Sequence, residues 1–220
     1  MNGKGFLIVV EGPDGVGRTS VLRDLRLGLE ADGLAPALVR LRGSAGLRAP
    51  LRDLQRRSDI SERALFLLYV ADLAAVYREE IAPALAAGRV VLSDRYTLTP
   101  VVRAESRGME RSWAAEVLSF LPPPDLTLLL EAPARLRVQR MLARRRFLTP
   151  RESGAGATYR RDPQAMLIRY QRQLDALFHD RAQADGVVAL DATRDPAALA
   201  GEALALVRAL RATPVAVQAP

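Results

Sequence analysis

The sequence predicts a three-layer α/β domain, in which helices cover both faces of a five-stranded parallel sheet. The chain of 220 residues is long enough for one domain with a sizeable core. Short, continuous apolar runs, typical of strands buried on both faces, alternate with segments of helical periodicity. Because the intervening segments are long enough for helices, they favour helical crossovers between parallel strands.

The elements follow in order along the chain. Residues 6–10 (FLIVV) predict the first strand, which a glycine-rich loop and a helix ended by Gly33 follow. A second strand is expected at 36–41, and a long helix from its cap, Ser61, to about Leu85. The other expected elements are strand 89–94, helix 111–120, strand 125–132, helices opened by Pro133 and Pro163, strand 186–192 and a helix opened by Pro196.

Composition limits the classes of function. The chain has no cysteine and a single histidine, His179, which excludes ordinary thiolate and histidine metal sites. Its net charge of +7 comes from 31 arginines and Lys4, spread among acidic residues without clustered aromatics. The apolar stretch 64–76 is too short to span a bilayer. We therefore expect a cytoplasmic protein that binds neither nucleic acid nor membranes, with one domain over 1–212 and a flexible tail, 213–220.

The loop after the first strand carries the clearest motif. Residues 12–19 (GPDGVGRT) match the phosphate-binding pattern G-x-x-x-x-G-K-[ST], except that Arg18 replaces lysine. In this pattern backbone amides turn toward phosphate oxygens, the helix N-terminus adds positive charge, and the hydroxyl meets magnesium. The motif predicts a P-loop NTPase fold. The predicted phosphate-binding residues are Gly12, Gly15, Gly17, Arg18, Thr19 and Ser20.

Arg18 leaves two interpretations open, because an arginine is longer and more forked than the lysine it replaces. In one, the guanidinium still neutralises the phosphates and activity is retained, though it is weakened. In the other, the site binds nucleotide but transfers phosphate slowly or not at all.

Several motifs in the same order resemble those of the thymidylate kinase family, over about residues 5–210. Residues 11–20 (EGPDGVGRTS) are similar to the family's E-G-x-D-G-x-G-K-[ST]-T, and 67–96 to its helix, strand and D-R-[YF] motif. Residues 125–133 (DLTLLLEAP) resemble D-L-T-[FL]-x-L-D-x-P. The resemblance implies a homodimeric kinase that transfers phosphate from ATP, with Mg²⁺, to a nucleoside monophosphate, with dTMP as the best single candidate.

The resemblance also implies roles on the acceptor side. Asp14 would contact the sugar hydroxyl or a magnesium-bound water, while Asp94 and Thr19 would help to hold magnesium. Arg95 would clamp the acceptor phosphate, which suits a forked guanidinium. Arg40 would be a further phosphate contact. Taken alone, Asp94 and Arg95 leave open the alternative of a simple ion pair at a strand end.

Other implied roles concern the base and the donor. Tyr69 would stack on the acceptor base, although a tyrosine on an apolar helix is more often a core residue. Arg140 and Arg144 would be lid arginines, closing over the donor and stabilising charge on the transferred group. The lid segment itself is expected at about 143–161. Together with Arg18, Asp94 and Arg95 they make the expected catalytic set. Arg144 could also be part of a solvated helix end.

The departures from the family pattern concern the acceptor base. Leu73 stands where the family usually has an arginine, and Pro100 and Arg103 occupy positions near the nucleoside. A buried base edge without its partner costs on the order of 1–3 kcal/mol, enough to change the preferred acceptor. Two alternatives therefore stay open: a kinase acting on another phosphate acceptor, and a nucleotide-binding module with weak or no catalysis.

Overall fold

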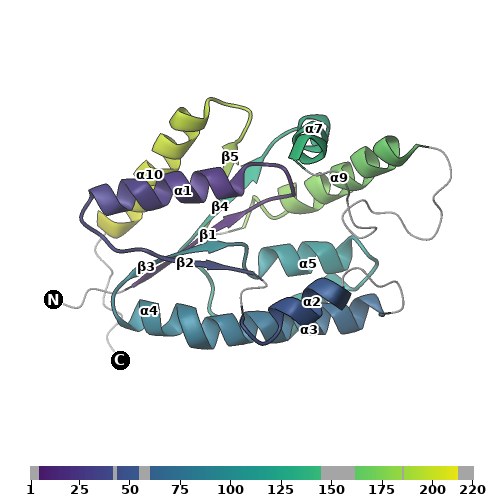
Figure 1. The fold of residues 1–220 in the computed structure, drawn as a ribbon, viewed down its shortest axis with the longest axis horizontal. Helices are drawn as coiled ribbons and strands as arrows, with labels where there is room; N and C mark the ends of the chain where they lie inside the picture. The colour runs from purple at the N-terminus through teal and green to yellow at the C-terminus, as the bar shows by residue number, and fades with distance from the viewer. Residues whose placement is uncertain (1–4, 42–43, 55–59, 145–161, 185, 213–220) are drawn as a thin grey trace.

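Five parallel strands form a single sheet in the order β2-β3-β1-β4-β5 in the computed structural model, which describes residues 5–41, 44–54, 60–144, 162–184 and 186–212 (Figure 1). The predicted fold class is confirmed. The predicted lid lies largely outside the described residues, and the predicted tail lies wholly outside them. The strands are β1 (Phe6–Glu11), β2 (Ala37–Arg40), β3 (Val90–Asp94), β4 (Leu126–Glu131) and β5 (Val187–Asp191).

Alternate side chains of β1 enter opposite layers of the core, which explains its unbroken apolar run. Leu7 and Val9 pack into one cluster, and Ile8 and Val10 into the other; none is more than 1% exposed. In Figure 1, α1 and α10 lie above the sheet, and α3 to α5 lie below it. The helices on these faces are α1 (Arg18–Ala31), α3 (Glu62–Val76), α5 (Leu98–Glu105), α6 (Arg111–Val117), α7 (Ala134–Arg144), α9 (Pro163–His179) and α10 (Pro196–Ala212).

The predicted long helix from Ser61 is continuous but not uniform. Ser61 caps it as expected, since its hydroxyl accepts a hydrogen bond from the amide of Ala64 at 3.2 Å. After α3 comes a π-helical turn, η1 (Tyr77–Ile81), and then α4 (Ala82–Ala86). The amide of Ala82 donates to the carbonyl of Tyr77, five residues back. This wider turn directly precedes Pro83, which lacks an amide and crowds an ordinary helical turn.

Two helices were not expected from the sequence, α2 (Arg48–Leu54) and α5, and two expected boundaries were wrong. The helix expected at 111–120 ends at Val117. Pro133 lies just before α7 rather than at its first position, because its carbonyl accepts the amide of Arg137 at 3.1 Å and so holds the cap position. Pro163 and Pro196 are first helical residues, as predicted.

Parallel pairing brings the carboxyl ends of the strands to one edge of the sheet. Asp94 is in register with Val10 on one side and with Arg40 on the other. Glu131 and Asp191 meet in the same way at the ends of β4 and β5. Ligands of open α/β sheets bind at this edge, so the candidate site is expected there.

Candidate functional site

The loop between β1 and α1 requires glycine at two positions. Gly12 has a φ angle of 129° and Gly15 one of 80°, conformations that other residues rarely adopt. A Cβ atom on Gly12 would lie 2.5 Å from the carbonyl oxygen of Leu130, and one on Gly15 would lie 2.6 Å from that of Arg137. Gly17 then caps α1 without a side chain. Because the first amides of a helix lack helical partners, this end of α1 suits an anion.

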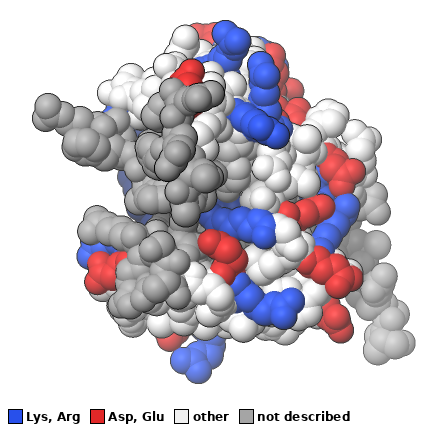
Figure 2. All heavy atoms as spheres, turned by 90° about the vertical axis from the view of Figure 1, so that its right-hand side faces the viewer, with Lys and Arg blue, Asp and Glu red and all other residues white. Residues whose placement is uncertain are grey.

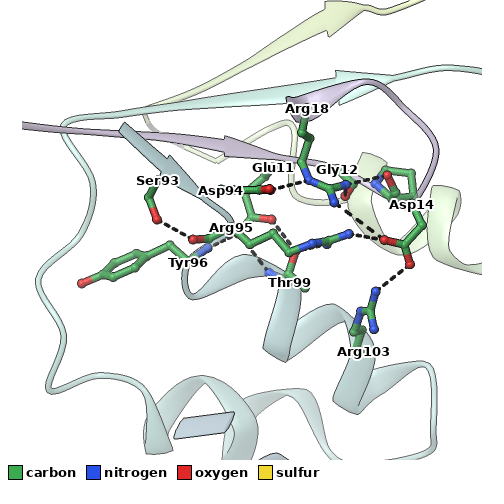
Figure 3. A network of polar contacts seen from close by, with 11 residues as sticks. Glu11, Gly12, Asp14, Arg18, Ser93, Asp94, Arg95, Tyr96, Thr99 and Arg103 are labelled. Carbon is green, nitrogen blue, oxygen red and sulfur yellow. Dashed lines mark hydrogen bonds and ion pairs between the residues drawn. The ribbon is translucent and has the colours of Figure 1, made fainter. Parts of the chain in front are cut away.

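Arg18 turns back over the loop instead of extending into solvent (Figure 3). Its Nη1 donates to the carbonyl oxygens of Gly12 and Pro13 at 2.6 and 2.7 Å. Its Nε donates to Oδ1 of Asp94 at 2.9 Å, and its Nη2 lies 3.7 Å from Oδ1 of Asp14. The guanidinium thereby joins the phosphate loop to the end of β3. Thr19, the hydroxyl residue of the motif, is exposed on the first turn of α1.

The carboxylate of Asp14 pairs with the other two arginines of the site, Arg95 and Arg103. Arg95 donates to its Oδ1 at 2.6 Å, and Arg103 donates to its Oδ2 at 2.7 Å. Figure 3 shows these two arginines reaching Asp14 from β3 and α5, opposite Arg18. The structure thus brings together five of the predicted residues, from four separate parts of the sequence: Asp14, Arg18, Asp94, Arg95 and Arg103.

Arg95 is held in an unusual state. Its φ angle of 73° is the one positive value at a non-glycine position in the part of the chain that the structure describes, a conformation that costs about 1–2 kcal/mol. Its amide bonds the carbonyl of Val10 at 3.1 Å, and its own carbonyl accepts the hydroxyl of Ser93 at 2.6 Å. Burial, and secondarily the charge of Arg18, lower the pKa of Arg95 to about 9. A bound phosphate dianion would offset both effects.

Glu11 positions this site, and sequence reasoning assigned it no role. Its carboxylate is fully buried and accepts the amides of Tyr96 and Thr99 at 2.9 and 3.1 Å, at the start of α5. The hydroxyl of Thr99 donates to the same carboxylate and accepts Nη1 of Arg95 at 2.6 Å. An acidic residue at the end of a buried strand was the available signal, since such a side chain needs donors from elsewhere.

A second unexpected residue, Arg137, lies beneath the loop. It is fully buried, and its Nη1 donates to the carbonyl of Asp14 at 3.1 Å. It also donates to the carbonyl of Ala132 at 2.9 Å and to the side chains of Gln171 and Asp175 in α9. One side chain therefore links the phosphate loop, the end of β4 and α9. Nothing in the sequence distinguished it from the many exposed arginines.

A small hollow opens beside Arg95, on the side where the acceptor is expected. Tyr69 lines it, and the side chain is only 8% exposed and also packs in a small apolar cluster. Leu73 is buried in the core on this face of the sheet. Arg40 is exposed, and none of the hollows described here includes it. The polar and aromatic lining comprises Phe66, Tyr69, Arg95, Thr99, Arg103 and Arg107.

A second hollow, of about 820 Å³, lies on the other side of the phosphate loop. Arg140 and Arg144 of α7 line it together with Gly15, Gly17 and Ser20, so the structure places both predicted donor-side arginines next to the loop. Arg194, which follows β5, lines it as well and was missed. Its position after the final strand was the available signal, because that strand ends at the same edge as β1.

The carboxylates of the site do not fit a metal ion in this arrangement. Both oxygens of Asp14 accept hydrogen bonds from arginines, and Oδ1 of Asp94 accepts one from Arg18. Magnesium requires oxygen ligands at about 2.0–2.1 Å, a distance at which these guanidinium groups would repel it. No group of three or more His, Cys, Asp or Glu side chains among the described residues could hold a metal. Among these groups, Thr19 is exposed and Oδ2 of Asp94 accepts no hydrogen bond from the described residues.

The surface around the site mixes both signs of charge. Figure 2 shows basic and acidic side chains side by side on the visible part of one face of the molecule. Charges of opposite sign also pair on the surface of the described residues, such as Arg111 with Asp180 at 2.8 Å. Within the described ranges, no helix is long and apolar enough to cross a membrane.

A parallel sheet whose central strand runs through a glycine-rich loop into a helix N-terminus defines a P-loop nucleotide-binding protein. The family model for thymidylate kinase matches residues 10–196. The chain is 34% identical over 211 residues to the thymidylate kinase of Deinococcus radiodurans, covering 93% of this chain and 97% of that protein. It is 37% identical over 189 residues to the thymidylate kinase of Leifsonia xyli (76% and 87% covered). The chain belongs to the thymidylate kinase family, and the family resemblance predicted from the motifs is confirmed.

Proposed function

We propose that this protein transfers the γ-phosphoryl group of ATP to dTMP, giving ADP and dTDP. One observation supports this most directly: Arg95 lies between the phosphate loop and an aromatic-lined hollow, in a chain that belongs to the thymidylate kinase family. A phosphate acceptor in that hollow would meet a buried guanidinium a short way from the donor's phosphates. Proximity and orientation of this kind supply much of the rate of phosphoryl transfer.

In the proposed mechanism, arginine side chains position the phosphates and neutralise their charge. The loop amides and Arg18 hold the donor phosphates, while Arg140 and Arg144 approach them from α7. Arg95 exchanges its bond to Asp14 for the acceptor phosphate and aligns one phosphate oxygen with the γ-phosphorus. Since the acceptor is a dianion, no general base is needed. Magnesium binding remains a prediction, and the proposed mechanism contains no step that depends on it.

A nucleotide-binding module without useful catalysis is the second candidate, and one observation favours it. Arg18 donates from Nε and Nη1 to Asp94 and two loop carbonyls, so these groups are not free to follow charge onto a transferred group. Such a protein would bind ATP and remain without turnover.

Acceptor-dependent ADP formation across a panel of nucleoside monophosphates, with dTMP included, separates these functions. Fast turnover with dTMP is the expected result. Faster turnover with a different acceptor would still support a kinase, and it would assign the choice of acceptor to the hollow lined by Arg103 and Arg107. ATP binding without turnover for any acceptor would replace the kinase proposal by the binding module.

A further inference from the structure

Arg18 occupies the position between the two carboxylates that face the phosphate loop. Its Nε is 2.9 Å from Asp94 and its Nη2 is 3.7 Å from Asp14. Asp94 ends β3 and Asp14 belongs to the loop, so the guanidinium lies between the acids that a phosphate-bound cation would approach. A positive charge is already present at this point before any ligand binds.

The hydrogen bonds of Arg18 leave one edge of the guanidinium for a ligand. Of its five N–H groups, those on Nε and Nη1 donate to Asp94, Gly12 and Pro13. Within the described residues, Nη2 has only the longer ion pair to Asp14 and donates no hydrogen bond. The side chain as a whole is 12% exposed. Two N–H groups on one nitrogen, backed by a fixed fork, suit phosphate oxygens.

Three of the four carboxylate oxygens of Asp14 and Asp94 accept hydrogen bonds from arginines. Arg95 and Arg103 take the two oxygens of Asp14, and Arg18 takes Oδ1 of Asp94. A divalent ion could bind these oxygens only by displacing charge-assisted hydrogen bonds of 2.6–2.9 Å and by approaching three guanidinium groups.

We propose that the guanidinium of Arg18 acts as the resident cation of the nucleotide site, so that nucleoside di- and triphosphates bind the loop with little dependence on divalent ions. A lysine at position 18 could not do this equally well, because a compact ammonium group cannot hold Asp94, two loop carbonyls and a phosphate oxygen together. The inference rests on the proposed nucleotide binding, and it goes beyond it by assigning the neutralising charge to the chain itself.

The test compares the Kd of ADP measured in excess Mg²⁺ with the Kd measured in EDTA, both by isothermal titration calorimetry. For the natural protein we expect the two Kd values to agree within about threefold, whereas the Arg18→Lys variant loses about tenfold or more when the ion is removed. The matched control is Arg26→Lys, on the same helix but paired at the surface with Glu30 at 3.2 Å, which should behave as the natural protein does.

Each outcome has a definite meaning. A natural protein whose affinity falls tenfold or more in EDTA would overturn the inference, and it would leave the proposed kinase intact. No ADP binding in either buffer would overturn the proposed function, and the inference with it. If Arg18→Lys fails to fold, as circular dichroism would reveal, the two titrations of the natural protein still decide the question.

Discussion

Asp14 is the residue on which the charges of the site converge. Arg18, Arg95 and Arg103 all face it, and two of them donate to it directly. Three arginines are therefore held close together without a ligand, which is costly unless a carboxylate lies between them. An incoming phosphate can take over the role that Asp14 performs in the free protein. The arginines are thus already placed for anions, and binding requires an exchange of partners rather than a rebuilding of the site.

Replacing Arg95 tests the acceptor side of the mechanism. We expect Arg95→Ala to lower kcat/KM for dTMP by about 100-fold or more, because the acceptor phosphate loses its forked contact. Steady-state kinetics and circular dichroism would show whether activity falls while the fold remains. The control is Arg111→Ala, which removes an exposed arginine paired with Asp180. Rates near those of the natural protein would remove Arg95 from the mechanism.

The lowered pKa of Arg95 predicts a pH dependence for acceptor binding. A phosphate favours the charged guanidinium, so its affinity is complete below a pKa of about 9 and is lost as the pH rises through that value. Deoxyribose 5-phosphate is a suitable competitive inhibitor, because it has no ionisable base. Its inhibition constant should rise about tenfold between pH 8 and pH 10. A constant value over that range would show that Arg95 keeps its charge.

At the scale of elements, the strands could be predicted better than the helices that carry the site. The central strands β1, β3 and β4 are largely apolar and almost wholly buried, and burial on both faces of a parallel sheet produces that pattern directly. Helix α5 was missed because its start is fixed by Glu11, a residue 85 positions before Tyr96, whose amide it accepts. No local pattern reports such a distant partner. The phosphate loop was predictable for the opposite reason, since its residue spacing and its positive φ angles are local features.

The contacts of two arginine side chains, Arg18 and Arg137, could not be predicted from local sequence patterns. The motif placed Arg18 at the phosphates, but its bond to Asp94 depends on how one flexible side chain folds back. Arg137 shares its sequence surroundings with exposed arginines of α7, and only the packing of α9 above it makes it buried. Long-range packing decides both cases.

Arg137 should stabilise the junction between α7, α9 and the phosphate loop. In Arg137→Met, the side chains of Gln171 and Asp175 and the carbonyl of Asp14 lose their donor. Gln171 and the loop carbonyl lose a buried partner, whereas water partly compensates Asp175, which is 34% exposed, so we expect a loss of about 2–3 kcal/mol in the free energy of unfolding.

Urea denaturation followed by circular dichroism would measure this loss. The matched control is Arg135→Met, an exposed position on the same helix, which should change the free energy of unfolding by less than about 0.5 kcal/mol. Equal effects of the two substitutions would mean that the contacts of Arg137 add no net stability.

At the scale of the whole molecule, α3 presents a surface that suits a second copy of the chain. Its outward side carries Ala64, Leu67 and Ala71, and Leu67 is 45% exposed. The opposite side of the helix is buried in the core, so α3 is apolar almost all round. We propose that the protein is a homodimer that packs these helices together, as the family resemblance also implies.

Light scattering after gel filtration would test the dimer. The natural chain should have twice the mass of the 24.0 kDa monomer, and Leu67→Arg should shift it toward the monomer, because a charge would be buried at the interface. Leu27→Arg changes a leucine that is 52% exposed on α1 and should leave the dimer unchanged. A natural chain that runs as a monomer would contradict the proposal.

Both ends of the described chain lie on the side of the sheet away from the phosphate loop. β1 begins at Phe6, at the edge of the sheet opposite the phosphate loop, and α10 returns to that edge, where Arg208 pairs with Asp32 at 2.7 Å (Figure 1). The two ends of the described chain therefore leave the molecule on the side away from the site. Tethering the protein to a biosensor surface through either end should leave the nucleotide edge open to solution, so binding can be followed in real time on the immobilised protein.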